Sequence, residues 1–334
     1  MPQKDRISVL GDGGWGTTLA LLLAGKGYRV TLWGAFPKYV DEVRRKRENV
    51  KFLPGFRIPA GVRLESDLAA ACRGADLIVL AVPSQFLRGV VRRMKAEGAG
   101  GAPLVIVAKG IETGSLKVMS QVVRDELGNV SVCVLSGPTI ARDVARKLPA
   151  AVSVASSNRA LAAKVRKIFS TDYFSLFESD DVLGVELGGS VKNVLAIASG
   201  ILEGLGYGSN TRAILFARGV AEMARLGRKM GARRETFMGL SGLGDLATTC
   251  LSPSSRNRSL GEAIGKGKKL KALLAGTEMV VEGVDTAKAA AKLAKKLNVK
   301  MPITEAVNGV LFEGKKPDTI LKALLNCGHH RELD

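Results

Sequence analysis

The stretch "ISVLGDGGWGTTLALLLAGKGYRVTLWG", residues 7–34, joins two apolar runs through a turn rich in glycine. Gly11, Gly13 and Gly16 within it have the spacing GxGxxG. The first run predicts a buried strand, the residues after Gly16 predict a helix, and a second strand follows within about 30 residues. In that context the glycines allow a tight turn, a close approach of backbone to a diphosphate, and contact of helix against strand. The stretch therefore predicts a dinucleotide site near the start of the chain.

Further apolar runs continue this pattern to about residue 180. The runs expected to form strands lie at residues 6–10, 28–33, 75–83, 103–109 and 130–138, with two more in "AAVSVASS" and "YFSLFES". Near-continuous apolar runs that alternate with helical segments are typical of a parallel sheet covered by helices on both faces. We therefore predict an α/β fold in which residues 1–183 form an N-terminal Rossmann-type, doubly wound, dinucleotide-binding domain.

The pattern changes after residue 183. Strand-like runs disappear, and Ala, Leu, Lys and Gly recur at helical spacing in segments such as "RAILFARGVAEMARLGRKMG" and "DTAKAAAKLAKKLNV". This periodicity is that of helices with one buried face. We predict that residues 184–334 form a mainly α-helical C-terminal domain that binds substrate.

Composition argues against several classes of function. The formal net charge is +19 over 334 residues, but the basic residues are spread along the chain without a nucleic-acid-binding motif, so we expect capture of small anions and no nucleic acid partner. We expect no membrane span, because no uninterrupted apolar run reaches about 18 residues. The four cysteines, Cys72, Cys133, Cys250 and Cys327, lie far apart, which fits a reducing cytoplasm and gives no metal-binding spacing.

The segment "VELGGSVKNVLAIASGILEGLGYG", residues 185–208, predicts a buried helix that carries Lys192. Since His329 and His330 are the only histidines and lie in the polar tail, a proton transfer in this protein needs another side chain, and lysine is one of few choices. Two interpretations of Lys192 follow from the residues alone. Its methylenes lie along apolar neighbours with the charge in water, or the ammonium group is buried and takes part in chemistry.

Polar residues in three other motifs are candidates for a ligand site. Lys109 follows an apolar strand in "VAKGIE", and Gly137 and Thr139 follow another in "LSGPTIARDVA". Ligands of open α/β sheets bind beyond the carboxyl ends of the strands. In "GLSGLGDLATTCLSPSSRNR", serines and Arg256 at a helix start could bind a phosphate monoester, with Asp245 nearby in sequence. Each motif also fits an ordinary structural role: a solvated lysine, a strand-to-helix turn or a helix N-cap.

Together these motifs resemble the bacterial-type glycerol-3-phosphate dehydrogenases [NAD(P)+] over nearly the whole chain. The resemblance is carried, in order, by "GDGGWGTTLA", "VPSQFLR", "AKGIE", "SGPTIA", "ELGGSVKNVLAIASG", "GLGDLATTC", "SSRNR" and "VVEG". It implies reversible reduction of dihydroxyacetone phosphate to sn-glycerol 3-phosphate with NADP or NAD and no metal, in the cytoplasm, for glycerophospholipid synthesis. It also implies a homodimer formed through the helical domain.

The resemblance implies roles for individual residues. Lys192 matches the proton-transfer group, with Lys109 and Asp245 beside it. Matches to substrate-binding positions are Lys109, Gly137, Thr139, Lys192, Asn193, Asp245, Thr249, Ser255, Arg256 and Asn257. Matches to cofactor-binding positions are Gly11, Gly13, Gly14, Trp15, Gly16, Ala35, Lys109, Ala141, Arg256, Val280 and Glu282.

The end of the second predicted strand bears on the choice of cofactor. NAD-preferring folds usually place Asp or Glu there to bind the ribose 2′-hydroxyl. This chain has Gly34, Ala35 and Phe36 in "TLWGAFPKYV", so no carboxylate at these positions would repel a 2′-phosphate, which favours NADP and leaves NAD open. Asp12 stands where the family commonly has alanine, and a charge beside the pyrophosphate turn requires that its side chain point away.

Two other functions compete with this assignment. A β-hydroxyacid dehydrogenase, such as a 6-phosphogluconate dehydrogenase, also joins a Rossmann domain to a helical one and uses a lysine, but "SSRNR" and "GLGDLATTC" favour the glycerol phosphate enzyme. A silent nucleotide sensor or a nucleic-acid binder belongs to a different class. The presence of Lys109, Lys192 and Asp245 argues against a catalytically silent sensor. Tight DNA binding with a steep dependence on salt concentration would indicate the nucleic-acid binder.

Overall fold

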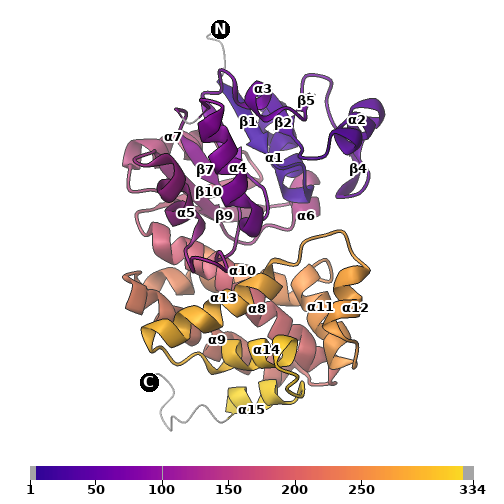
Figure 1. The fold of residues 1–334 in the computed structure, drawn as a ribbon, viewed down its shortest axis with the longest axis vertical. Coiled ribbons are helices and arrows are strands. Elements are labelled where there is room, and N and C mark those ends of the chain that lie inside the picture. Colours follow the sequence, from indigo (N-terminus) through magenta and orange to yellow (C-terminus); the bar gives the residue numbers. More distant parts are fainter. Residues whose placement is uncertain (1–4, 100, 326–334) are drawn as a thin grey trace. The chain divides into compact units, whose positions relative to one another are not determined.

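The computed structural model describes residues 5–99 and 101–325, which form two compact units (Figure 1). The chain passes between the units after Ala108, after Val118 and after Val182. The predicted boundary between residues 183 and 184 lies one residue from the last of these crossings. It placed the segment Lys109–Val118 with the sheet, whereas the contacts of this segment place it in the helical unit.

An eight-stranded sheet forms the centre of the first unit, in the order β10-β9-β8-β7-β6-β1-β2-β5. The strands are β1 (Arg6–Leu10), β2 (Arg29–Trp33), β5 (Arg63–Glu65), β6 (Leu77–Leu80), β7 (Leu104–Ile106), β8 (Val132–Ser136), β9 (Ala150–Ala155) and β10 (Phe174–Ser179). All neighbouring strands are parallel except β8 and β9. A separate antiparallel pair consists of β3 (Glu48–Asn49) and β4 (Leu53–Arg57). The predicted α/β fold class is confirmed.

Helices cover both faces of this sheet, which is why every residue of β6, β7 and β8 is buried. One group of contacting helices is α1 (Gly14–Gly25), α6 (Ala141–Ala145) and α7 (Arg159–Phe169), and the other is α3 (Leu68–Cys72), α4 (Ser84–Ala96) and α5 (Met119–Leu127). Helix α2 (Pro37–Lys46) follows β2. The strand order reverses between β1 and β6, and ligands of doubly wound sheets bind at such a switch point.

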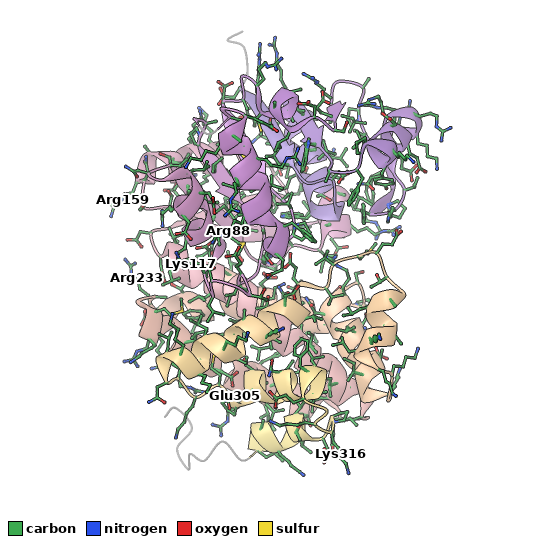
Figure 2. All side chains as sticks on the ribbon, viewed as in Figure 1. Arg88, Lys117, Arg159, Arg233, Glu305 and Lys316 are labelled. Carbon is green, nitrogen blue, oxygen red and sulfur yellow. The ribbon has the colours of Figure 1, made fainter. Side chains whose placement is uncertain are left out.

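The contact between α4 and α5 includes a charged cluster on the outer side of their layer. Arg88 of α4, labelled in Figure 2, pairs with Asp125 at 3.1 Å and with Glu126 at 2.6 Å, both on α5. Arg92 also reaches Glu126, at 2.9 Å. A shared carboxylate with two arginine partners links the two helices more firmly than an isolated surface pair would.

The second unit is helical, as predicted. It contains α8 (Val182–Gly204), α9 (Ser209–Met230), α10 (Asp245–Leu251), α11 (Arg256–Gly265), α12 (Leu270–Ala275), α13 (Glu282–Leu297), α14 (Pro302–Phe312) and α15 (Thr319–Leu325), with a 3-10 segment η1 (Arg234–Met238) and a π-helical segment η2 (Leu240–Gly244). Within the described residues, α8 alone is long and apolar enough to cross a bilayer, and its most apolar window is entirely buried in the protein. This burial identifies α8 as a core helix.

Glycines bring α11 directly against α8. A Cβ atom at Gly261 of α11 would lie 2.9 Å from the carbonyl carbon of Ile197, and one at Gly204 of α8 would lie 2.9 Å from the Cα of Gly265. The two backbones can approach this closely only because side chains are missing at these positions. The close packing sets Asn257, in the first turn of α11, beside Asn193 of α8.

The segment Lys109–Val118 is anchored in the helical unit by its own turn. Ile111 and Val118 form a β-bridge, the amide of Glu112 donates to the carbonyl of Lys117 at 2.9 Å, and both Ile111 and Val118 are buried in the core of the second unit. Burial of Ile111 and Val118, which follow Lys109 in sequence, therefore holds Lys109 in the helical unit.

Candidate active site

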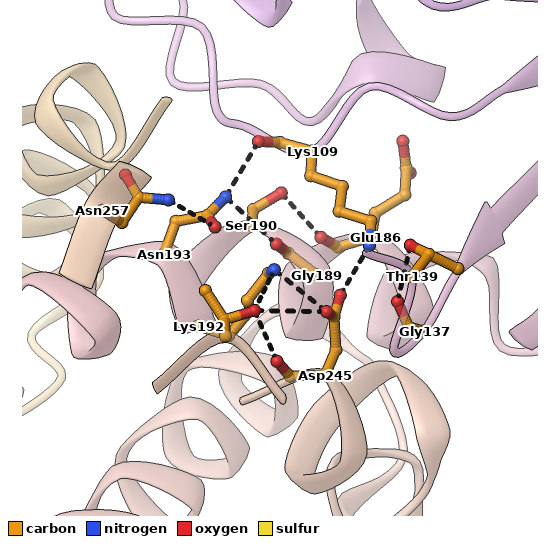
Figure 3. A network of polar contacts seen from close by, with 11 residues as sticks. Lys109, Gly137, Thr139, Glu186, Gly189, Ser190, Lys192, Asn193, Asp245 and Asn257 are labelled. Carbon is orange, nitrogen blue, oxygen red and sulfur yellow. Dashed lines mark hydrogen bonds and ion pairs between the residues drawn. The ribbon is translucent and has the colours of Figure 1, made fainter. Parts of the chain in front are cut away.

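Lys192 lies on the buried surface of α8 and is only 6% exposed. Its Nζ donates to Asp245 Oδ1 at 3.0 Å and to Thr249 Oγ1 at 2.6 Å (Figure 3). Of the two interpretations open from the sequence, the structure supports burial in a polar cluster, because the ammonium group is bonded to protein oxygens inside the unit.

Asp245 joins Lys192 to a second lysine. The carboxylate is 2% exposed, and its Oδ2 accepts a hydrogen bond from Lys109 Nζ at 2.7 Å. One buried carboxylate thus faces two ammonium groups. Its position depends on η2, which ends immediately before Asp245 and packs closely on α8: a Cβ at Gly188 would lie 2.6 Å from Ser241 O.

The surroundings of Lys192 favour proton release. Burial lowers the pKa of Lys192 from 10.5 to about 8; the positive charge of Lys109 lowers it as well, and Asp245 opposes part of the shift. An acid with a pKa close to the working pH is well suited to give and recover a proton. By contrast, burial raises the pKa of the neighbouring Cys250 thiol to about 12, so this cysteine stays protonated and is a poor nucleophile.

Hydrogen bonds fix the residues around the lysine. The Thr249 hydroxyl donates to the carbonyl of Asp245 at 2.6 Å and accepts from Lys192, so it orients the ammonium group. Asn193 Nδ2 donates to the carbonyl of Lys109 at 3.3 Å, and Asn193 Oδ1 accepts from Asn257 Nδ2 at 2.9 Å. The network therefore ties the start of the Lys109–Val118 segment to α8 and α11.

The start of α11 has the features of a phosphate site. Ser255 is the N-cap and accepts from the amide of Arg258 at 3.2 Å, and Asn257 accepts from the amide of Gly283 at 3.0 Å. Arg256 is exposed, and its Nη1 donates to the carbonyl of Val280 at 2.5 Å, two residues before Glu282 begins α13. A helix N-terminus with an accessible guanidinium group is suited to a phosphate dianion.

The glycine-rich turn of the first unit fits a dinucleotide. Gly11 has φ +121°, and a Cβ there would lie 2.6 Å from the carbonyl carbon of Ala81. Gly13 is the N-cap of α1, has no side-chain cap, and borders open space. A Cβ at Gly16 would overlap the carbonyl of Gly11, so helix and turn pack at contact distance. The N-terminal amides of α1 can therefore approach a diphosphate.

The remaining predicted residues of this unit follow β1, β2 and β8 in sequence. Thr18 Oγ1 donates to the carbonyl of Ala141 at 3.1 Å and to that of Gly14 at 2.8 Å, which brings α6 to the start of α1. Thr139 Oγ1 donates to the carbonyl of Gly137 at 3.1 Å. The remaining two residues are Trp15, whose ring packs edge-on against Phe174, and Ala35, which is exposed after β2. The carboxyl ends of parallel strands are the expected place for such residues.

Within residues 5–99 and 101–325, no group of three or more His, Cys, Asp or Glu side chains is placed to hold a metal ion. Cys327, His329 and His330 lie outside the described residues.

Asn49 was not predicted from the sequence to belong to a site. Its side chain is fully buried and donates a hydrogen bond to the carbonyl of Asp12, but no motif in the sequence around Asn49 indicates this contact.

Comparison with known proteins assigns the chain to a family. Models for the N-terminus and the C-terminus of NAD-dependent glycerol-3-phosphate dehydrogenase match residues 6–162 and 181–322. The chain belongs to this family. The resemblance of its motifs to glycerol-3-phosphate dehydrogenases is thereby confirmed, and Lys109 falls in the N-terminal match while Lys192 and Asp245 fall in the C-terminal one.

Relatives in the glycerol-3-phosphate dehydrogenase family align along nearly the whole chain. A glycerol-3-phosphate dehydrogenase [NAD(P)+] from Geobacillus kaustophilus is 46% identical over 333 residues, 99% of this chain and 97% of the relative. One from a Geobacter species (strain M21) is 48% identical over 314 residues, 93% of this chain and 94% of the relative. The crystal structure of the Coxiella burnetii glycerol-3-phosphate dehydrogenase matches with a TM-score of 0.94 and 39% identity, covering 97% of this chain and 100% of that one.

Proposed function

We propose that this chain catalyses the reversible NAD(P)-dependent reduction of dihydroxyacetone phosphate to sn-glycerol 3-phosphate. The observation that carries the proposal is the buried cluster in which one carboxylate, Asp245, holds Lys109 and Lys192. Membership of the glycerol-3-phosphate dehydrogenase family supports the substrate. The nicotinamide, when bound, exchanges the hydride. The protein must therefore exchange the proton.

In this mechanism Lys192 gives its proton to the developing alkoxide during reduction and takes it back during oxidation. Asp245 and Thr249 hold the ammonium group in one orientation, which reduces the reorganisation needed at the moment of transfer. Lys109 and the amide of Asn193 stabilise negative charge on the same oxygen. Burial and the charge of Lys109 both lower the pKa of Lys192, so Lys192 releases its proton more readily than an isolated lysine would.

The pH dependence of reduction should reflect Lys192. Only the protonated lysine can act as an acid, and burial sets its pKa at about 8. We expect kcat/KM for reduction to be highest near pH 7, above the phosphate pKa of about 6, to drop to about half of that value near pH 8, and then to fall toward tenfold per pH unit. The oxidation of glycerol 3-phosphate should show the opposite limb and rise through the same pH. A reduction profile that stays level to pH 9.5 would exclude this lysine as the acid.

Arg256 binds the phosphate group of the substrate in this proposal. Charged hydrogen bonds contribute about 1.5–3 kcal/mol, so Arg256→Ala is expected to raise KM for dihydroxyacetone phosphate by about 10- to 150-fold. The matched control is Arg228→Ala, which removes an exposed guanidinium from α9. Turnover of unphosphorylated dihydroxyacetone should respond little to either change. Equal losses on both substrates would contradict the assignment.

The direct test of the function is oxidation of NADH and of NADPH, measured in parallel, on addition of dihydroxyacetone phosphate. Turnover with a phosphorylated three-carbon ketone and none with 6-phosphogluconate or other β-hydroxyacids supports the proposal. Cofactor binding without turnover of any of these substrates would leave the nucleotide sensor as the better explanation.

The cellular setting is part of the same proposal. The three cysteines in the described residues, Cys72, Cys133 and Cys250, are free and buried, which fits a reducing compartment such as the cytoplasm. There the product would supply glycerophospholipid synthesis. A homodimer through the helical unit follows from the family resemblance, and sedimentation equilibrium of the purified chain would test it.

A further inference from the structure

The carboxylate of Asp12 occupies the space at the end of β2 that a side chain on Gly34 would enter. Gly34 follows β2 directly, at the position where NAD-binding sheets commonly carry Asp or Glu. A Cβ at Gly34 would overlap Asp12 Oδ2 and would lie 2.6 Å from Asp12 Cγ. The acidic group is therefore supplied from the glycine-rich turn and not from the strand. The sequence argument for NADP considered Gly34, Ala35 and Phe36 and did not take the carboxylate of Asp12 into account.

Hydrogen bonds through the buried side chain of Asn49 keep Asp12 in this position. Asn49 Nδ2 donates to the carbonyl of Asp12 at 2.6 Å and to Thr17 Oγ1 at 2.7 Å. The hydroxyl of Tyr39 donates in turn to Asn49 Oδ1 at 2.7 Å. Residues from α1, α2 and β3 thus hold the turn that carries the carboxylate, so the charge is presented by a fixed backbone.

One oxygen of this carboxylate has no donor from the protein. Oδ2 of Asp12 is buried and makes no hydrogen bond to any residue that the structure describes, although the residue as a whole is partly exposed. Burial raises the pKa of Asp12 to about 6, against the opposing effects of its own amide and of Lys51, so most molecules carry the charge at neutral pH. A buried acceptor without a donor is costly and points to a ligand that brings one.

Three of the basic residues that follow β2, Arg44, Lys46 and Arg47, are engaged in other contacts. Arg44 pairs with Asp41, and Lys46 pairs with Glu42 at 2.6 Å. Arg47 donates to the carbonyls of residues 58 and 62, at 3.2 and 3.0 Å. These three cations would have to leave their present partners before they could neutralise a 2′-phosphate.

We propose that Asp12 selects NAD(H) over NADP(H), by accepting a hydrogen bond from the adenosine ribose and repelling a phosphate at its 2′ position. The inference rests on the proposed use of a dinucleotide by this enzyme, and it reverses the expectation of NADP. A hydroxyl group brings a donor to the carboxylate, whereas a phosphate brings a second negative charge.

Binding, measured without turnover, tests the assignment. NADH, NADPH, 5′-AMP and 2′,5′-ADP would each be titrated by calorimetry into the full chain, into Asp12→Asn, and into Asp172→Asn as a control that removes an exposed carboxylate between α7 and β10. We expect the wild type to bind NADH at least tenfold more tightly than NADPH. Asp12→Asn keeps the shape and removes the charge, so it should reduce that ratio at least tenfold. Asp172→Asn should leave the ratio unchanged.

The outcomes separate this inference from the proposed function. Equal or tighter binding of NADPH by the wild type overturns the role of Asp12, as does an equal weakening of both cofactors in Asp12→Asn. If that variant does not fold, the wild-type comparison of 5′-AMP with 2′,5′-ADP decides alone, since tighter binding of 2′,5′-ADP overturns the role. Selective NADH binding without turnover of dihydroxyacetone phosphate would refute the proposed function and leave Asp12 as the selector.

Discussion

Lys192→Met is expected to lower kcat for reduction of dihydroxyacetone phosphate by about 10²- to 10⁴-fold, the usual contribution of a positioned acid. Methionine keeps most of the side-chain length and suits the buried wall of α8, so the fold should survive. The removed group is the only proton donor that this mechanism uses. Binding of NADH should change little, since Lys192 is not among the residues that match cofactor-binding positions.

The matched control for this substitution is Lys292→Met, which removes an exposed lysine from α13. Its kcat should stay within a factor of two of the wild type. If Lys192→Met retained more than a tenth of the wild-type kcat, the proton would have to come from elsewhere. Lys109 would then be the next candidate, because it shares the same carboxylate.

Asp245→Asn is expected to affect stability and catalysis together. Removing one partner of a buried ion pair typically costs about 3–5 kcal/mol, because the remaining charge stays buried. Here two ammonium groups lose their counter-charge at once, although Lys109 is the more exposed of the two. Urea denaturation would measure the loss. The pKa of Lys192 should fall, since Asp245 raises it in the wild type, and the high-pH limb of reduction should therefore move to lower pH than in the wild type.

A double-mutant cycle provides the control for Asp245. In the Asp245→Asn background, Lys109→Met removes one of the two uncompensated charges, so the pair of substitutions should cost less than the sum of the single ones. Strict additivity, together with an unchanged pH profile, would show that Asp245 has no electrostatic role toward the lysines.

The fold could largely be predicted because its strands and helices have different patterns of apolar residues along the sequence. Continuous apolar runs such as those of β6 and β8 indicated buried strands, and the apolar surface of α8 indicated a core helix. The antiparallel pairing of β8 with β9 could not be predicted in this way, because an apolar run does not encode strand direction. The placement of Lys109–Val118 was also missed, since its anchors Ile111 and Val118 look like any two apolar residues in a loop.

The candidate site could be predicted residue by residue only through the family resemblance. Asp245 is 136 residues from Lys109 and 53 residues from Lys192, and no local pattern records such pairings. The sequence did indicate that Lys192 needs a partner, because a buried ammonium group is costly. For Asp12 the sequence showed only that an aspartate replaces the alanine common in the family. That its carboxylate lies beside Gly34 at the end of β2 depends on the conformation of the glycine-rich turn and could not be predicted.

The segment Lys109–Val118 belongs to the helical unit, although the residues before and after it belong to the sheet unit. This arrangement affects how chimeras of this enzyme with other dehydrogenases could be built. Because the chain crosses between the units three times, no single cut divides it into its two units. Consider a chimera in which everything after Val182 comes from another dehydrogenase. The residues equivalent to Lys192 and Asp245 would come from that enzyme, whereas Lys109 and the rest of the segment Lys109–Val118 would come from this chain. In such chimeras the segment Lys109–Val118 and the helical unit must come from the same protein, since Ile111 and Val118 are part of the hydrophobic core of the helical unit.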